Sequence, residues 1–308
     1  MIDIAVVLFG LIIGSFLSVC VYRIPLGRST GLDELFEEEE ESDEEGVEEE
    51  ELGEEDLLNS PHFQKRVTIA YPPRSFCPHC GEKLKWYHNL PVVSYALLLG
   101  KCGFCKERIS WKYPTIELLS AFFAWLSYAT FDPVTAALAY IFAAGLIVIS
   151  FIDLEYFIIP NVITYPAFVL GILFGVEQTF FGLVKAPPFV PGIVESGIGV
   201  LTGAGILLSI SLFYTYVRKK QGLGLGDVKL LAVTGAFFGF HGAFYTIFVG
   251  SLLGSLLGVA FMLLGRGRWS SYIPFGPYLA AANLLYLYYA QELALFLSQV
   301  AVQHQGYQ

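Results

Sequence analysis

Long apolar stretches with almost no charge recur along this sequence of 308 residues, 55% of which are hydrophobic. A helix of about 20 such residues spans the roughly 30 Å hydrocarbon core of a bilayer. The sequence therefore predicts an all-α integral membrane protein, a polytopic bundle of about eight transmembrane helices. The expected spans are residues 2–22, 114–131, 134–152, 162–182, 194–217, 229–241, 243–264 and 276–297. The sixth span is short for a full crossing, so seven spans remain an alternative.

The first apolar stretch has the length of a signal peptide but lacks its other features. It has no basic amino-terminal flank and no small-x-small cleavage site, and Arg23 and Arg28 follow it. We therefore expect residues 2–22 to be retained as the first span.

Glycines recur four residues apart in several predicted spans. This spacing puts small residues on one helix face, where they let two helices approach closely in lipid. Glycine is also simply frequent in membrane helices, which is the alternative explanation. The glycines concerned are Gly10/Gly14, Gly171/Gly175 and Gly250/Gly254/Gly258.

The positions of Lys and Arg predict the orientation. With the amino terminus outside, Lys185 alone of the 18 basic residues falls outside the cytoplasm. The positive-inside rule favours this arrangement. The long loop at residues 23–113 and the sequence around Asp153 and Asp227 then lie on the cytoplasmic side.

The net charge of −10 comes from one acidic insert. Seventeen of the 28 acidic residues lie between Asp33 and Asp56, and without them 18 basic residues face 11 acidic ones. Residues 30–60 contain too little apolar material to order themselves, so we expect a disordered tract. The tract is either a solvated segment or an electrostatic attractor for basic peptides.

Residues 65–113 are different, because they contain aromatic residues, prolines and two C-x2-C pairs 21 residues apart. Two such pairs direct four thiolates to one point, which suits a closed, structural zinc site. A cytoplasmic loop is kept reducing, so two disulfides are a weaker alternative, as is an iron–sulfur centre. His79 and His88 are near enough to replace a ligand, but we expect them to be polar surface residues. Cys20 is expected to be a small buried residue. The expected ligands are Cys77, Cys80, Cys102 and Cys105.

Four carboxylates outside the acidic insert call for more than loop solvation: Glu117, Asp153, Glu155 and Asp227. Asp153 ends the third span and Asp227 begins the sixth, so both are expected at one depth on the cytoplasmic side. Two aspartates in one site hold one proton between them and can activate a water, which is aspartic-protease chemistry. The alternatives are an ion- or proton-coupled transporter site and structural carboxylates, with Asp227 as a helix N-cap.

The glycines before Asp227 favour a peptide-binding role. Gly224 and Gly226 free the backbone to bend and allow a substrate strand to approach the carboxylate. A phosphate loop would need Ser or Thr after its Lys, whereas leucines follow Lys229. The sequence therefore excludes a phosphate loop.

Six stretches resemble those of bacterial type IV prepilin peptidases and occur in the family's order, covering nearly the whole chain apart from residues 30–60. They are "GLIIGSFLSVCVYRIP" (10–25), "NLPVVSYALLLGKC" (89–102) between the cysteine pairs, "ISWKYPTIELLSA" (109–121), "IDLEYFIIPNVIT" (152–164), "GLGLGDVKLLA" (222–232) and "IPFGPYLA" (273–280).

The resemblance implies a GxGD-type aspartic membrane peptidase of the bacterial inner membrane. It would cut the basic leader from type IV prepilins and secretion pseudopilins after a glycine, on the cytoplasmic side. Asp153 and Asp227 match the catalytic pair, and Glu117 matches a family position as a second-tier candidate, with pairing to the helix dipole as the alternative. Residues expected to support the active-site loops are Gly224, Gly226, Lys229 and Pro160.

The resemblance also implies a second activity, because many bacterial members methylate the new amino terminus with S-adenosylmethionine. The cysteine-bearing loop accompanies that bifunctional form. Zinc and S-adenosylmethionine are thus the expected cofactors, and prepilins and the lipid bilayer the expected partners, with no nucleic acid. The expected domains are a first transmembrane helix (1–22), a cytoplasmic loop whose zinc module is associated with methylation (23–113) and a transmembrane peptidase (114–308). No residue is assigned to S-adenosylmethionine.

Three features depart from the family pattern. Ser18 stands where Asn is expected, Asn161 stands where Asp is commoner, and residues 30–60 have no counterpart. Neither substitution touches the expected catalytic pair.

Overall fold

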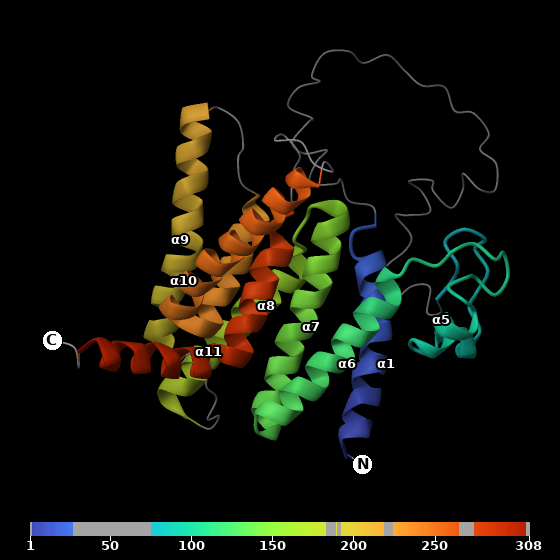
Figure 1. Cartoon of the computed structure of the whole chain (residues 1–308), viewed down its shortest axis with the longest axis horizontal. Coiled ribbons are helices and arrows are strands. Elements are labelled where there is room, and N and C mark those ends of the chain that lie inside the picture. Colours follow the sequence, from blue (N-terminus) through green and yellow to red (C-terminus); the bar gives the residue numbers. More distant parts are fainter. Residues whose placement is uncertain are drawn as a thin grey trace. The chain divides into compact units, whose positions relative to one another are not determined.

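The computed structural model describes residues 2–26, 75–182, 189, 192–218, 224–264 and 274–305. These residues form helices joined by turns, with two isolated β-bridges and no longer strand (Figure 1). The predicted acidic insert at 30–60 lies outside them. The helices are α1 (Ile2–Arg23), η2 (Trp86–Asn89), α5 (Val93–Leu97), α6 (Lys112–Thr130), α7 (Pro133–Tyr156), α8 (Asn161–Phe180), α9 (Ile193–Arg218), α10 (Leu225–Leu263) and α11 (Gly276–Gln305).

The helices confirm the predicted all-α membrane protein. Within the described segments, five helices are long and apolar enough to cross a bilayer, namely α1, α7, α8, α9 and α10. The expected spans at 114–131 and 276–297 also form helices, α6 and α11, but both are less hydrophobic than those five. The hydrophobic pattern thus predicted every long helix, to within a few residues at most ends.

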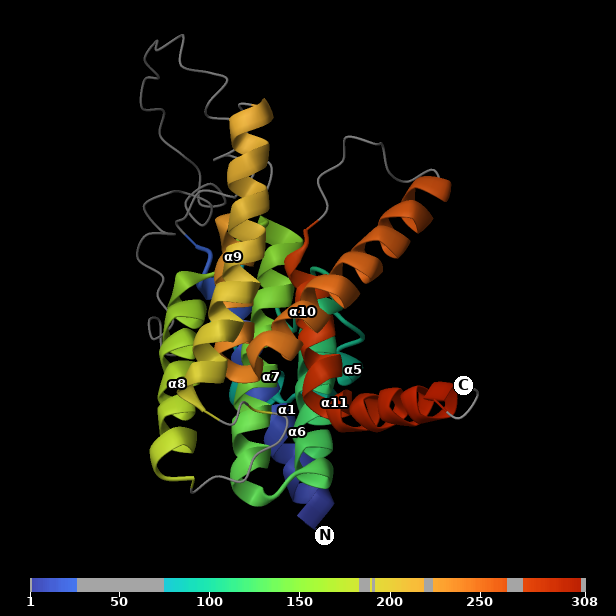
Figure 2. The ribbon, with the colours of Figure 1, turned by 90° about the vertical axis from the view of Figure 1, so that its left-hand side faces the viewer.

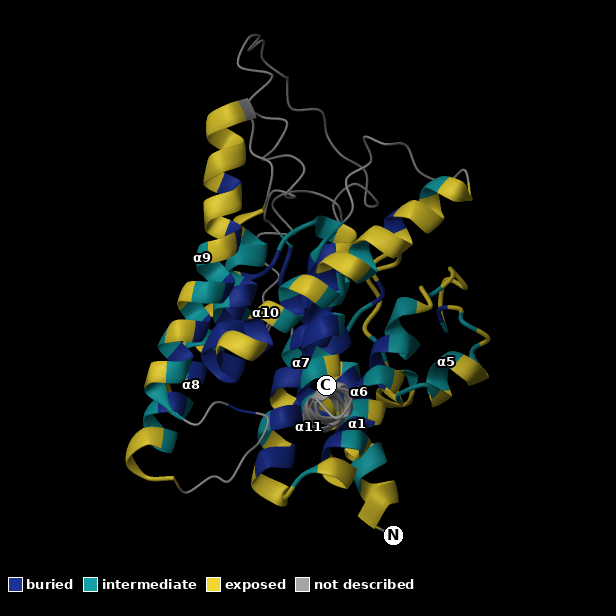
Figure 3. Cartoon of the chain, turned by 60° about the vertical axis from the view of Figure 1, so that its left-hand side comes forward, coloured by how far each residue is buried: buried dark blue, intermediate teal, exposed yellow. Residues whose placement is uncertain are grey.

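Much of the exposed surface of these helices is apolar. The part of α9 near its carboxyl end exposes Leu212, Phe213, Tyr216 and Val217, and this end of the helix is yellow in Figure 3. A contiguous apolar surface of this kind would aggregate in water. Lipid is therefore its natural surrounding.

The fold places a sharp break inside α10, three residues before the predicted junction at residue 242. Gly239 has φ 66° and ψ −162°, a conformation open to glycine alone. Figure 2 shows α10 changing direction at its middle. The predicted start of this span at residue 229 was also wrong. The helix begins four residues earlier, at Leu225, so that its first turns include the polar residues Asp227 and Lys229.

The chain divides into two compact units, each described by itself. The first contains Met1–Ala129 and Ala143–Ile158, and the second contains Thr130–Phe142 and Ile159–Gln308. The single helix α7 therefore contributes residues to both. The functional division expected at residues 22 and 113 stays a prediction.

In the first unit, α1 and α6 pack backbone to backbone. A Cβ atom added at Gly10 would lie 2.6 Å from Ala121 Cα, and one added at Gly14 would lie 2.6 Å from Glu117 Cα. The Ser120 hydroxyl donates a 2.7 Å hydrogen bond to the Gly10 carbonyl across the same contact. The close approach expected from the Gly10/Gly14 spacing is therefore confirmed.

In the second unit, α9 and α10 cross at Gly199 and Gly235, where any Cβ would overlap the opposite backbone. The Ser196 hydroxyl donates to the Ala236 carbonyl at 2.9 Å beside this crossing. Gly171 meets the Ala236 side chain in the same region, which agrees with its predicted role. Gly199 and Gly235 each begin a further pair spaced four residues apart, Gly199/Gly203 and Gly235/Gly239, which the sequence analysis did not single out.

Replacing Gly14 with Val should destabilise the protein by about 3 kcal/mol or more. The new side chain would meet α6 backbone, which cannot move aside as a flexible side chain can. Thermal unfolding in detergent measures the loss. Gly205→Val is the matched control, because nothing lies within 4 Å of a Cβ at Gly205. Equal melting temperatures for the two variants would contradict the close-packing account.

Candidate functional site

The cysteine module consists of two matching knuckles, whose first cysteines, Cys77 and Cys102, are 25 residues apart (102 − 77). Each is a tight hairpin closed by one β-bridge, Phe76 with Lys83 and Lys101 with Arg108. The Cys77 N–H donates to the Glu82 carbonyl at 3.0 Å, and the Cys102 N–H donates to the Glu107 carbonyl at 2.8 Å. The two hairpins thus use the same hydrogen bonds to present their thiols.

The knuckles bring all four cysteines together. Their sulfur atoms lie within 4.8 Å of one another, and Cys77 Sγ lies 3.9 Å from Cys105 Sγ. A tetrahedron with Zn–S bonds of about 2.3 Å separates its sulfurs by about 3.8 Å. The thiols are free, and Cys77 and Cys102 are buried. The cluster therefore fits a metal ion with four thiolate ligands, as the spacing predicted.

The two buried thiols differ in acidity. Burial raises the pKa of the Cys77 thiol to about 12. Burial also acts to raise the pKa of Cys102, but the backbone N–H groups of Phe104 and Cys105 more than offset it and hold that pKa at about 7. Because a metal binds thiolates, its affinity should rise with pH as the more basic thiols release their protons.

The knuckles differ at one backbone position. Gly81 has φ 67° in the first hairpin, whereas Lys106 takes the matching place in the second with φ 63°. A side chain in this left-handed region costs about 1 kcal/mol. Lys106→Gly should therefore raise the stability of the module, and Gly81→Lys should lower it, each by about 1 kcal/mol. Thermal unfolding of the full-length protein checks both signs, and a loss of stability in Lys106→Gly would refute the strain.

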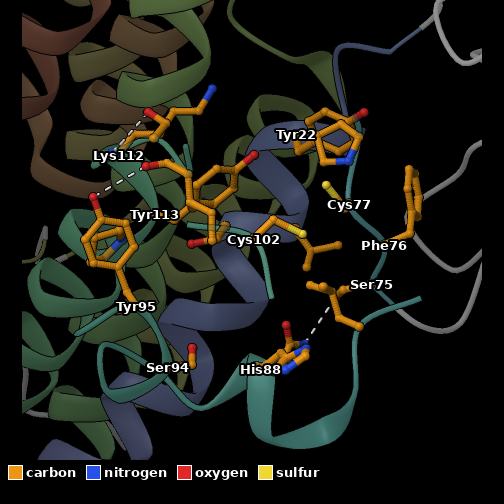
Figure 4. Close-up of a pocket in the computed structure, with 18 of the residues that line it drawn as sticks. Tyr22, Ser75, Phe76, Cys77, His88, Ser94, Tyr95, Cys102, Lys112 and Tyr113 are labelled. Atoms are coloured by element: carbon orange, nitrogen blue, oxygen red, sulfur yellow. Dashed lines mark hydrogen bonds between the residues drawn. The ribbon is translucent and has the colours of Figure 1, made fainter. Parts of the chain in front are cut away.

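A cavity of about 380 Å³ lies in the first unit beside the cysteine cluster. Residues from α1, the two knuckles, the segment between them, α6 and the end of α7 line it, and Figure 4 shows several of these side chains. Its aromatic lining comes from separate segments of the chain and includes Tyr22, Phe76, Tyr95, Tyr113 and Tyr156. The sequence did not reveal this convergence, because no two of these aromatics share a motif.

Glu117 lies in the lining of this cavity. It is 8% exposed, and its Oε2 accepts a 2.7 Å hydrogen bond from the Val92 N–H. Val92 has φ 59°, an unfavourable conformation for a β-branched residue. Glu117 lines the cavity and also accepts the backbone N–H of this strained turn. Glu117, the second-tier candidate from the sequence, thus lies in the lining of a cavity.

Two further polar features of the cavity were not predicted. Lys112 and Glu155 form an ion pair of 2.7 Å, which joins the start of α6 to the end of α7. His88 is not part of the cysteine cluster; it stacks edge-on against Phe104, and its Nδ1 is buried without a hydrogen-bond partner. His79 is exposed, as expected of a surface histidine, whereas His88 is not.

Asp153 lies in the last turn of α7, in the first unit, and is only 5% exposed. The helix ends because Phe157 turns to φ 56° and donates its N–H to the Asp153 carbonyl at 3.0 Å. A buried aspartate at the end of an apolar helix is costly, which marks it as a functional candidate. Cys20, in α1 of the same unit, is buried as expected.

Asp227 lies in the second unit, in the first turn of α10. The alternative that Asp227 is the N-cap is wrong, because Gly224 occupies that position with φ −64° and ψ 131°. The Asp227 N–H donates to the Gly224 carbonyl at 3.2 Å, and a carboxylate in this turn also benefits from the helix dipole. A Cβ at Gly226 would lie 2.9 Å from the Ile159 Cβ, so a larger residue would push that loop away.

The other predicted supporting residues lie at the start of α8 and in α10. Pro160 is the N-cap of α8, and its carbonyl accepts the Thr164 N–H at 3.2 Å. Lys229 Nζ donates to Asn161 Oδ1 at 2.9 Å and lies 5.6 Å from the centre of the Tyr165 ring. Asn161 thus accepts a hydrogen bond where an aspartate would form an ion pair.

Both halves of the chain match families of known proteins. Residues 8–131 match the Bacterial Peptidase A24 N-terminal domain, and residues 140–259 match the Type IV leader peptidase family. A protein of Aeromonas hydrophila called prepilin leader peptidase/N-methyltransferase is 32% identical over 94% of this chain and 91% of its own length. The chain belongs to the type IV leader peptidase family. Among solved structures, none matches it significantly.

Other members of the family are similar over the same extent. A protein of Pseudomonas aeruginosa is 32% identical over 93% of this chain and 90% of its own length, and one of Dichelobacter nodosus is 33% identical over 94% and 92%. Both have the same descriptive name as the Aeromonas protein. Asp153 and Asp227 both fall within the residues matched to the Type IV leader peptidase family.

Proposed function

We propose that this protein is a prepilin leader peptidase that also methylates the amino terminus it exposes. The observation that carries the proposal is the match to prepilin leader peptidase/N-methyltransferases over 94% of the chain. Asp153 and Asp227 lie inside the part matched to the peptidase family, and each sits at the end of an apolar helix. The proposed substrates are type IV prepilins and secretion pseudopilins.

In the proposed reaction, Asp153 and Asp227 share one proton. The ionised carboxylate takes a proton from water as the water attacks the scissile carbonyl carbon, and the protonated one donates to the carbonyl oxygen. The tetrahedral intermediate then loses its amine, which leaves with a proton. Gly224 and Gly226 keep the backbone beside Asp227 narrow enough for an extended peptide. Lys229 and Pro160 support the proposal by fixing the starts of α10 and α8.

The cysteine cluster is proposed to hold a structural zinc ion. Four thiolates leave no open coordination position, so the metal would organise the loop and take no part in the reaction. We further propose that the loop at residues 23–113 and both aspartates lie on the cytoplasmic side of a bacterial inner membrane, with the amino terminus outside. Lys and Arg positions support this orientation.

One assay tests both activities. The purified full-length protein is incubated with a prepilin in detergent, with and without S-adenosylmethionine, and the product is read by mass spectrometry. We expect loss of the leader in both reactions and a methylated amino terminus only with the cofactor. An intact prepilin after prolonged incubation would overturn the peptidase assignment. A cleaved but unmodified product would overturn the methyltransferase assignment alone.

A further inference from the structure

The cavity beside the cysteine cluster is unused by the proposed peptidase chemistry. Neither Asp153 nor Asp227 is among the residues that line it, and all of those residues belong to the first unit. Its volume of about 380 Å³ falls in the range of small-molecule sites, roughly 300–1,000 Å³. The unit therefore contains a separate compartment of the size that a nucleoside-based cofactor needs.

We propose that this cavity binds an adenosyl sulfonium methyl donor, with Tyr113 in contact with the adenosyl group and Glu117 facing the sulfonium. The proposal rests on the methyltransferase half of the proposed function. Its structural basis is the combination of aromatic walls, one buried carboxylate and an unsatisfied imidazole nitrogen in a single cavity.

The aromatic walls suit the two parts of such a donor. Tyr22, Tyr95 and Tyr113 lie around the cavity in Figure 4 and come from α1, α5 and α6. Aromatic rings stack on a nucleobase, and each stack contributes about 1–3 kcal/mol. The faces of the same rings also attract organic cations. A donor with a purine at one end and a sulfonium near its centre would use both interactions, the stacking and the attraction of the cation.

The charges in the lining complement the same donor. Lys112 already neutralises Glu155, whereas Glu117 accepts hydrogen bonds from the neutral Val92 N–H and Ser15 hydroxyl. Both donors favour the ionised form of the carboxylate. A carboxylate at Glu117 therefore offers negative charge to a bound cation. Arg23, 6% exposed and also in the lining, is a cation that suits a carboxylate of the donor.

The buried Nδ1 of His88 is a second, independent sign of a ligand. A buried polar atom without a partner costs about 1–3 kcal/mol, so such atoms are rare unless something binds them. His88 lines the cavity, and its ring packs against Gly103 and Phe104. An amino or hydroxyl group of the donor would supply the missing hydrogen bond.

The chain's groups would orient the two reactants. When bound, S-adenosylmethionine supplies its methyl group to the amine: the N–C bond forms as the C–S bond breaks, sulfur keeps the electron pair, and the amine proton passes to solvent. Glu117 and the tyrosines that line the cavity would hold the sulfonium in place.

Isothermal titration calorimetry of the full-length protein in detergent tests the site with two probes, S-adenosylmethionine and S-adenosylhomocysteine. Tyr113→Ala should raise both dissociation constants about tenfold or more. Glu117→Gln should weaken the cationic S-adenosylmethionine about fivefold while changing the neutral S-adenosylhomocysteine less than about twofold, because Gln keeps a hydrogen-bond acceptor for Val92 and removes only the charge.

Matched controls lie outside the cavity. Tyr128→Ala changes an exposed tyrosine of the same helix, and Glu82→Gln changes an exposed carboxylate of the first knuckle, so both should bind like the wild type. Circular dichroism and metal content show whether each variant is folded. Unchanged binding in folded Tyr113→Ala and Glu117→Gln overturns the site. A wild type that cleaves prepilin but binds neither probe also overturns it, while leaving the peptidase intact.

Discussion

Asp153→Asn and Asp227→Asn should each lower the rate of prepilin cleavage by about 10³-fold or more. The amide of Asn can neither take a proton from the attacking water nor donate one to the carbonyl oxygen, so the shared-proton mechanism loses one of its two partners. Because Asn has nearly the shape of Asp, the amount of folded protein should change little. Cleavage of a purified prepilin, followed by mass spectrometry, measures the loss.

The matched control is Asp132→Asn, which makes the same change in an exposed loop aspartate. The amide oxygen of this variant can still accept a hydrogen bond from Thr135, the local partner of Asp132, so normal cleavage is expected. The double variant Asp153→Asn/Asp227→Asn should be no slower than either single variant, since residues that act as a unit are not additive. Full cleavage by either single variant would exclude the pair as the catalytic centre.

Cys102→Ala should remove the bound metal from the purified protein. The remaining three thiolates give an open site that loses zinc to a chelator, and the knuckles then lose the ion that joins them. We expect close to one zinc per chain in the wild type by elemental mass spectrometry and almost none in the variant. The stability of the cysteine module should fall with it, by several kcal/mol.

Cys20→Ala provides the control, because Cys20 is a buried cysteine of α1 outside the cluster. It should keep its full zinc content. If Cys102→Ala retained zinc as well, the cluster would not be the metal site. If the wild type contained no zinc and its mass showed two disulfides, the oxidised alternative would replace the metal.

The cysteine cluster could be predicted because its geometry is local. Two residues between Cys77 and Cys80, and two between Cys102 and Cys105, form the same turn wherever they occur, so spacing alone determines where the thiols point. The long helices were predictable for a similar reason, since hydrocarbon thickness sets their length. Both rest on rules that need no tertiary contact.

The cavity could not be predicted, because its residues meet only in the folded unit. Tyr22 and Tyr113 are 91 positions apart (113 − 22), and the Val92 N–H of the strained turn donates to Glu117 of α6, 25 residues away. The break in α10 was predicted three residues too late, at residue 242, because hydropathy locates the junction between two apolar stretches only approximately, whereas the backbone turns at Gly239 itself. The pairing of Asp153 with Asp227 stays a prediction from topology and family.

The break in α10 has a consequence for how the proposed reaction would depend on lipid. The straight part of the helix from Leu225 to Gly239 rises over 14 residues (239 − 225), which is about 21 Å. That is shorter than a hydrocarbon core of about 30 Å, so a segment of this length would connect both surfaces only where the bilayer thins around it. The depth of Asp227, two residues from the start of α10, would then follow membrane thickness, and a thinner bilayer would bring the carboxylate nearer the water that hydrolysis consumes. The rate of the enzyme would then depend on the acyl-chain length of the lipid, because the position of Gly239 sets the length of this helical segment.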